Sequence, residues 1–301
     1  MRNQILIIYL LLGLSLPLTA QTHSALEISV GGGWSTLGYK VQPHQADVKG
    51  TNKGSWGAQA HVGYALFFTP NVGLGVGANF SHYGANASLS GIAQWNDVTD
   101  TEGERYNHLT IIHSLNDKQD VYLVEIPITL YLSFPISYRL HFNLEAGAKY
   151  GIPILKYASF HADVEHQGNY GIWGLNIYDV PNHGFYRERD FNNTYSIAVK
   201  DQLSVFLKLG LAYDINRKMQ FFANIYGDYG FKNTVTAGNT ELGFKNDRAG
   251  MASAHSFMPD YNGIIATNNI SSKSHPLQIG LEVGLRFIFP HKRVYSCRCM
   301  L

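Results

Sequence analysis

Polar and apolar residues alternate with a period of two along most of the chain, as in β-strands whose two faces meet different surroundings. The segment from Leu277 to Phe289 is the clearest case. Its odd positions are all apolar, and its even positions include Gln278, Glu282 and Arg286. Seven further segments repeat the pattern, at residues 26–35, 56–68, 72–81, 122–132, 138–150, 203–214 and 219–229. The sequence therefore predicts an all-β protein with eight antiparallel strands.

The connections between these segments alternate between short and long. Three are tight and contain the Pro or Asn that turns favour, at residues 69–71, 134–137 and 216–218. The other four span residues 40–53, 85–119, 151–201 and 232–274. Most strands are long enough for a tilted strand to cross a membrane, which takes about 9–11 residues. We therefore predict a transmembrane up-and-down β-barrel with short periplasmic turns and long extracellular loops.

Aromatic residues on the apolar faces gather near both ends of the strands, with small and aliphatic residues between them. A soluble β-barrel with an apolar core has no reason to sort its aromatics in this way, whereas two membrane interfaces do. The pattern thus favours lipid outside and polar groups inside. The predicted girdle at the long-loop ends is Trp34, Trp56, Phe80, Tyr122, Tyr150 and Tyr229, and that at the short-turn ends is Phe68, Tyr138, Tyr213, Phe221, Phe287 and Phe289.

The polar faces of the strands carry charges of both signs, and an eight-stranded barrel has an interior that side chains nearly fill. We expect Glu145 to pair with Lys208 and Glu27 with Arg286. Two interpretations stay open: a charge network that plugs the lumen, and a gated polar pathway. The predicted lumen network is Glu27, Glu125, Glu145, Lys208, Glu282 and Arg286, and the same faces also carry Arg139, Lys149 and Asp228.

The N-terminus has the pattern of a cleaved signal peptide. Arg2 precedes an apolar run over residues 5–18, and Ala20 provides a small residue before Gln21. The run is shorter than the ~20 residues that a membrane-spanning helix needs. We predict a signal peptide at residues 1–20, a barrel at residues 21–290 and a periplasmic tail at residues 291–301, which holds Cys297 and Cys299.

Composition adds two constraints. Charged residues make up 15% of the chain and the formal net charge is +1. Soluble domains usually carry roughly 25% charged residues. The low charge suits a protein whose outer face meets an apolar medium, and the near-zero net charge gives no support for a nucleic-acid partner.

Three features resemble the OmpA-like and PorT-like outer-membrane β-barrel families. They are the run Val124-Glu125-Ile126-Pro127-Ile128, the glycine-rich alternating strands, and the final segment from Gly284 to Phe289. The resemblance covers about the whole mature chain. It implies the outer membrane of a Gram-negative bacterium, with membrane lipid and the barrel-assembly machinery as partners and no cofactor. The chain departs from the pattern at its end, where Pro290 and a tail follow the terminal aromatic.

No catalytic residue is predicted. Adjacent His and Ser residues occur at positions 81–82, 113–114 and 255–256, but neighbours in a strand point to opposite faces. A cluster of His161, Asp163, Glu165 and His166 has loose spacing, so we interpret it as part of a solvated loop and predict no metal site. The chain is therefore expected not to be an enzyme.

The aromatics within residues 151–201 either anchor a ligand or pack the loops into an ordered cap. We predict a non-enzymatic barrel that is structural or binds an extracellular ligand or partner through loops 85–119, 151–201 and 232–274. The alternatives are an enzyme at the barrel rim that acts on lipid or peptide, and a narrow channel.

Overall fold

The computed structural model describes residues 23–41, 47–100, 103–234, 264–265 and 273–290. Within these residues the chain is almost entirely antiparallel β-structure, with one three-residue 3-10 turn, η1 (Pro181–His183). Eight long strands are β1 (His23–Thr36), β2 (Val48–Phe67), β3 (Val72–Thr99), β4 (Arg105–Pro135), β5 (Leu140–Tyr170), β8 (Gln202–Asn216), β9 (Met219–Gly230) and β10 (Leu277–Pro290). Two shorter strands are β6 (Leu175–Ile177) and β7 (Arg187–Ser196).

No helix in the described part of the chain has the length and apolar character needed to cross a bilayer.

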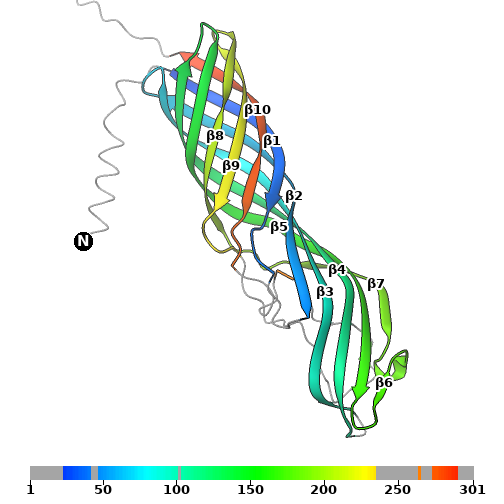
Figure 1. The fold of residues 1–301 in the computed structure, drawn as a ribbon. Coiled ribbons are helices and arrows are strands. Elements are labelled where there is room, and N and C mark those ends of the chain that lie inside the picture. The colour runs from blue at the N-terminus through cyan, green and yellow to red at the C-terminus, as the bar shows by residue number, and fades with distance from the viewer. Residues whose placement is uncertain (1–22, 42–46, 101–102, 235–263, 266–272, 291–301) are drawn as a thin grey trace, which may run out of the picture.

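The eight long strands close into a ring. Each pairs with the next, β5 pairs with β8, and β4 pairs with β5, while β1 pairs with both β2 and β10. At the seam between the first and last strands, Glu27 lies opposite Arg286. The ring forms the upper body in Figure 1. The predicted eight-stranded up-and-down β-barrel is confirmed.

Side chains in the barrel are sorted with the apolar ones outside. In β10, Leu281 is 66% exposed whereas Gln278 is fully buried, and Glu282 and Arg286 are buried on the same inner face as Gln278. The same alternation runs through the other barrel strands. A sheet that exposes its aliphatic face and buries its charges is stable only if the outer surroundings are apolar.

Strands β2 to β5 continue well past the barrel, and with β6 and β7 they form an extension (Figure 1). The prediction that residues 40–53, 85–119 and 151–201 are loops is therefore largely wrong. β2 begins at Val48, β3 and β4 join through a short connection between Thr99 and Arg105, and β5 continues to Tyr170. Most of the predicted loop at residues 232–274 lies outside the described residues.

A reversal of polarity explains this error. The alternation continues into the extension, but the two faces exchange character. In β3 the outward residues change from Leu74, Val76 and Phe80 to Asn86, Ser88 and Ser90, and the inward residues change from Asn79 and Ser81 to Tyr83, Ala85, Ala87 and Leu89. The pattern of apolar residues on the outward face ends near residue 82, although β3 itself continues to Thr99.

The inward residues of the extension form an apolar core, which we call the cap core. Leu115 and Tyr83 are fully buried in it, and it also takes in residues outside the strands. Because Leu123 and Glu125 are two residues apart on the inner face of β4, the cap core directly adjoins the polar lumen. Its buried members are Leu37, Tyr39, Val48, Tyr83, Ala85, Ala87, Leu89, Ala93, Ile112, Leu115, Val121, Leu123, Ala158, Phe160, Ala162, Val164, Ile197, Val199, Ile264 and Ile265.

Candidate functional site

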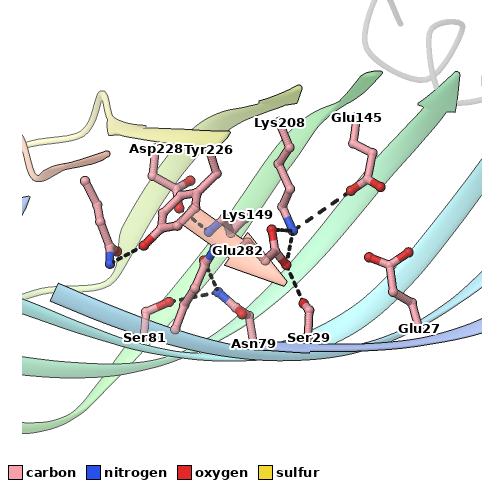
Figure 2. A network of polar contacts seen from close by, with 12 residues as sticks. Glu27, Ser29, Asn79, Ser81, Glu145, Lys149, Lys208, Tyr226, Asp228 and Glu282 are labelled. Carbon is pink, nitrogen blue, oxygen red and sulfur yellow. Dashed lines mark hydrogen bonds and ion pairs between the residues drawn. The ribbon is translucent and has the colours of Figure 1, made fainter. Parts of the chain in front are cut away.

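The barrel lumen contains a buried network of ion pairs. Arg286 in β10 donates to Glu27 in β1 at 2.9 Å and to Glu145 in β5 at 2.8 Å. Lys208 in β8 lies 2.8 Å from a carboxylate oxygen of Glu282 and 4.0 Å from Glu145. Figure 2 shows Lys208 reaching toward both carboxylates. Glu145 therefore links the two cations across three strands of the ring.

A second part of the network lies nearer the cap core. Lys149 in β5 pairs with Asp228 in β9 and lies 3.4 Å from Glu125 in β4. Glu125 also accepts hydrogen bonds from Asn79 and Ser81 of β3, each at 2.6 Å (Figure 2). All of these side chains are buried. Each charge among them has a partner of opposite sign, and Glu125 also accepts from two hydrogen-bond donors.

The structure places all six predicted network residues in the lumen. The expected neighbours Glu27 and Arg286 are in contact, while Lys208 lies closer to Glu282 than to Glu145. Lys149 and Asp228 belong to the network as well. The sequence predicts their position on the polar face of their strands but not their contact with each other. The placement of Arg139 on the inner face was wrong: it is exposed in the turn before β5, with Tyr213 as its hydrogen-bond acceptor at 3.5 Å.

Aromatic rings line the lumen beside the cations, which the sequence analysis missed. The guanidinium of Arg286 lies 5.3 Å from the ring centroid of Tyr131 and 5.4 Å from that of Phe222. The ammonium groups of Lys149 and Lys208 lie 5.3 and 5.7 Å from the ring of Phe206. Such contacts favour a cation over the ring face. A signal was available, because these aromatics occupy polar-face positions in the alternation.

The network lies between two different ends. Toward the long connections it meets the cap core at Tyr83, Val121 and Leu123. Toward the short turns, a cavity of about 180 Å³ reaches Arg286 and is also lined by His141 and Asp214, among other residues. An apolar core therefore directly follows the network at the end of the barrel that meets the extension.

The predicted aromatic girdles lie on the outer surface of the barrel. Trp34 and Trp56 face each other across β1 and β2, and each indole lies over a glycine of the neighbouring strand. A Cβ atom at Gly32 would approach the Trp56 ring to 2.7 Å, so a larger residue there would displace this indole. Phe80, Tyr150, Tyr229, Tyr138, Tyr213, Phe221 and Phe289 are exposed, and Tyr122, Phe68 and Phe287 are half-buried.

Histidine–carboxylate pairs occur at the rim and beyond it. His82 lies 2.8 Å from Asp120 and stacks on Tyr122, while the neighbouring Ser81 points inward to Glu125. A nucleophilic enzyme needs a hydroxyl or thiol within reach of such a base. Among the described residues, the hydrogen-bond partner found for His82 is Asp120.

The loosely spaced acidic and histidine cluster in β5 is divided between two faces. His161, Asp163 and Glu165 lie on the outer face, where each has a partner: Asn192, Arg187 and His113 respectively. His166 lies on the inner face and is buried. No group of three or more His, Cys, Asp or Glu residues suited to a metal ion occurs in the described parts of the chain.

A buried histidine pair in the extension was not foreseen. His108 Nε2 of β4 lies 3.1 Å from His166 Nδ1 of β5, and the Thr110 hydroxyl lies 3.2 Å from the same nitrogen. Burial, together with the neighbouring His166, lowers the pKa of His108 to about 3. Burial alone lowers the pKa of His166 to about 4. Both rings are therefore neutral near pH 7.

The aromatics of residues 151–201 divide into two groups. Phe160 is buried in the cap core, and Tyr170 and Phe185 are buried together with Tyr106 in a smaller cluster. Trp173 and Tyr178 are exposed. The first group packs the extension, and for the exposed residues the anchoring of a ligand stays a prediction.

Comparison with known proteins identifies a family. Residues 19–236 match the model of a family described as outer membrane protein beta-barrel domain. Comparison with curated proteins gave no match.

Among solved structures, the chain is similar to Neisserial surface protein A, with 8% identity, a TM-score of 0.35 and coverage of 88% of this chain and 96% of that one. It is also similar to OprG from Pseudomonas aeruginosa (11% identity, TM-score 0.33, coverage 90% and 99%). A third likeness is to the N-terminal β-barrel domain of OprF from the same species (10% identity, TM-score 0.33, coverage 89% and 99%). Identities and TM-scores this low carry no functional information.

Proposed function

Because the chain belongs to the outer membrane protein beta-barrel domain family, we propose that it is a non-enzymatic barrel that presents its extension outside the cell to bind a ligand or partner. The family implies the outer membrane of a Gram-negative bacterium. The barrel anchors and orients the extension, and the extension supplies the binding surface. Membrane lipid and the barrel-assembly machinery are the partners that a barrel of this family requires.

The observation that carries the proposal is the order of the extension. Strands β3, β4 and β5 continue without interruption from the lipid-facing band into a sheet that packs over the cap core. A purely structural barrel needs only short connections, whereas a binding surface benefits from a rigid support. The regions 85–119 and 151–201, in which we expected binding, lie in this sheet.

The lumen argues against transport. Lys149, Lys208 and Arg286 are each held by carboxylates from other strands, and the cap core adjoins the network at the end that meets the extension. Moving an ion through would require breaking buried pairs in a narrow barrel, at a cost of several kcal/mol each, about 3–5. The lumen thus serves as a structural filling rather than as a pathway.

The orientation follows the same logic. β10 ends at Pro290 beside the start of β1, at the end of the barrel that carries the short turns. We place the short turns and the tail at residues 291–301 in the periplasm, and the extension outside. Residues 1–20 act as a signal peptide that is removed on export.

A labelling experiment tests the orientation. A membrane-impermeant maleimide is added to intact cells that express the Ser90→Cys variant with Cys297 and Cys299 both replaced by serine. Ser90 is exposed on the outer face of β3 in the extension, so this variant should be labelled. The wild-type chain, with its two tail cysteines, should be labelled only after the cells are broken. Labelling of the tail alone in intact cells would contradict the proposed orientation.

Planar-bilayer recordings of the purified wild-type protein test the filled lumen. We expect no stable openings. Stable openings whose conductance changes in Lys208→Ala or Glu145→Ala would show that ions pass through the network, and the channel alternative would replace the proposal.

A further inference from the structure

An apolar turn lies at the end of the extension away from the barrel (Figure 1). β5 and β6 are joined by Gly171 to Gly174 at the end of the molecule away from the barrel (Figure 1). Four large apolar side chains at and beside this turn are exposed: Ile172 by 76%, Trp173 by 57%, Leu175 by 48% and Tyr178 by 64%. We call these four residues the apolar tip. So many adjacent exposed apolar groups usually mark an interaction site.

The segment that forms the apolar tip carries no charge, whereas the adjacent β3–β4 connection carries Asp100 and Glu104. Residues 168–178 have the sequence GNYGIWGLNIY, in which no residue is ionisable near pH 7. The nearest charged residue in sequence is Asp179, just after Tyr178. An aqueous loop would normally include charged residues, whereas eleven uncharged residues with an apolar apex suit a surface that leaves water.

The apolar tip has a defined shape. Gly174 has a positive φ of 62°, a conformation that glycine adopts without strain and that closes the turn. The Trp173 N–H donates to the Tyr170 carbonyl at 3.1 Å, and the two rings stack with centroids 5.6 Å apart. Trp173 is thus held in place before any partner binds.

The base of the apolar tip is anchored in the extension. Tyr170 is 5% exposed and stacks on Tyr106 with centroids 5.0 Å apart, and Phe185 packs edge-on against Tyr106. The Tyr170 hydroxyl donates to Asp100 at 3.0 Å. The exposed side chains therefore project from a packed support.

The chemistry of the apolar tip fits a lipid bilayer. Tryptophan and tyrosine beside aliphatic residues are the combination that lodges at a membrane interface, with the aliphatic groups deeper. A convex turn needs a matching pocket in a protein partner, but a fluid bilayer adapts to it. Tyr170 lies 20 positions beyond Tyr150 of the aromatic girdle in β5, a separation of up to about 65 Å along the strand. Because β6 lies at the end of the molecule opposite the barrel (Figure 1), the lipid surface is not that of the barrel's own membrane.

We propose that the apolar tip inserts into the lipid surface of an opposing membrane, with Trp173 at the interface and Ile172 and Leu175 among the acyl chains. This inference rests on the proposed function, and it names a phospholipid bilayer as the partner of the extension. The protein would then tether two membranes through the extension.

A two-membrane assay tests the proposal. The full protein is reconstituted in nanodiscs of ordinary phosphatidylcholine and mixed with vesicles of brominated phosphatidylcholine, which quench nearby tryptophans. We expect nanodiscs to float with the vesicles and the added vesicles to quench tryptophan fluorescence. The double variant Ile172→Ser/Leu175→Ser keeps Trp173, and we expect its apparent affinity for vesicles to fall by at least about tenfold. Ile92→Ser is the matched control, since Ile92 is an exposed aliphatic residue on β3 away from the apolar tip, and it should bind as the wild type does.

Three results would overturn the proposal. The wild type could fail to float with vesicles, the control could lose as much affinity as the tip variant, or the tip could promote association of nanodiscs without vesicles, which would make a second copy the partner. None of these results affects maleimide labelling or conductance, so a failure here is distinguishable from a failure of the proposed function. Circular dichroism and heat-modified gel mobility confirm that each variant is folded.

Discussion

Arg286 in the last strand and Glu27 in the first strand form an ion pair with a 2.9 Å contact across the seam that closes the barrel. Both side chains are buried, and the same guanidinium contacts Glu145 at 2.8 Å. One cation thus joins three strands, two of which are the first and last strands of the barrel.

The variant Arg286→Met should strongly destabilise the barrel. It leaves Glu27 and Glu145 as buried carboxylates without this cation, and the free energy of unfolding should fall by about 3–5 kcal/mol. Urea unfolding in lipid vesicles, followed by tryptophan fluorescence, measures the change. Arg217→Met, in the exposed turn between β8 and β9, should change it by less than about 0.5 kcal/mol. Equal stabilities for the two variants would mean that the seam does not depend on the pair.

Leu281 tests the lipid-facing surface. A charge at an outward position near the middle of the membrane costs about 2–4 kcal/mol in a transmembrane barrel, so Leu281→Arg should lower stability by that amount. Gln94→Arg is the matched control, because Gln94 is exposed on the extension. Folding titrations in lipid vesicles give both values. If the two variants lose the same stability, position 281 does not face the acyl chains.

Leu115 tests whether the extension has its own stability. It is fully buried in the cap core, and Leu115→Ala should cost about 2–5 kcal/mol. Because the barrel has separate contacts, the loss should appear locally. Amide hydrogen exchange should accelerate in β3, β4 and β5 beyond the barrel while β9 and β10 stay protected. Uniform acceleration in all strands would show that the two parts unfold as one unit.

The His108–His166 pair makes the extension sensitive to acid. Both pKa values lie below the ordinary value near 6.5, so the unfolded segment binds more protons than the folded one below that pH. Stability is complete above about pH 6.5 and is lost progressively as the pH falls toward 4. At pH 5 the loss amounts to about 2 kcal/mol for each histidine.

Hydrogen exchange of β4 and β5 between pH 7.5 and pH 5, corrected for intrinsic rates, measures this dependence. His166→Gln retains a hydrogen-bonding side chain and removes one of the titrating groups, so it should reduce the pH dependence by about half. His161→Gln, on the outer face of the same strand, is the control. If the extension of the His166→Gln variant is as sensitive to acid as that of the wild type, the histidine pair is not the cause of the sensitivity.

The barrel could be predicted from sequence because lipid and a packed lumen impose opposite requirements on alternate residues. The segment from Leu277 to Phe289 satisfies both over its whole length. The extension could not be predicted in the same way. Asn86 and Ser88 interrupt the apolar outward face of β3, and only the three-dimensional arrangement shows that Ala85 and Ala87 have become the apolar inner face.

The lumen network could be predicted from the sequence only in part. The alternation of each strand places Lys149 and Asp228 on the inner face. Their contact joins strands that are distant in sequence, so its geometry depends on the tilt and stagger of the strands. The inward position of Phe206 follows from the alternation, but its contacts with Lys149 and Lys208 show the same limit. The exposed apolar tip also required the structure, since Tyr170 and Trp173 have similar sequence surroundings but one is buried and the other is not.

The reversal of polarity in β3 fixes the depth at which the barrel sits. If the molecule sank by two residues, His82 would reach the level of Phe80 in the hydrocarbon, and if it rose by two, Phe80 would leave it. Since β4 reverses its faces close to the same level, between Lys118 and Val124, each strand opposes displacement in both directions. The boundary between the two patterns thus sets the insertion depth of the barrel and holds the extension at a constant height above the membrane.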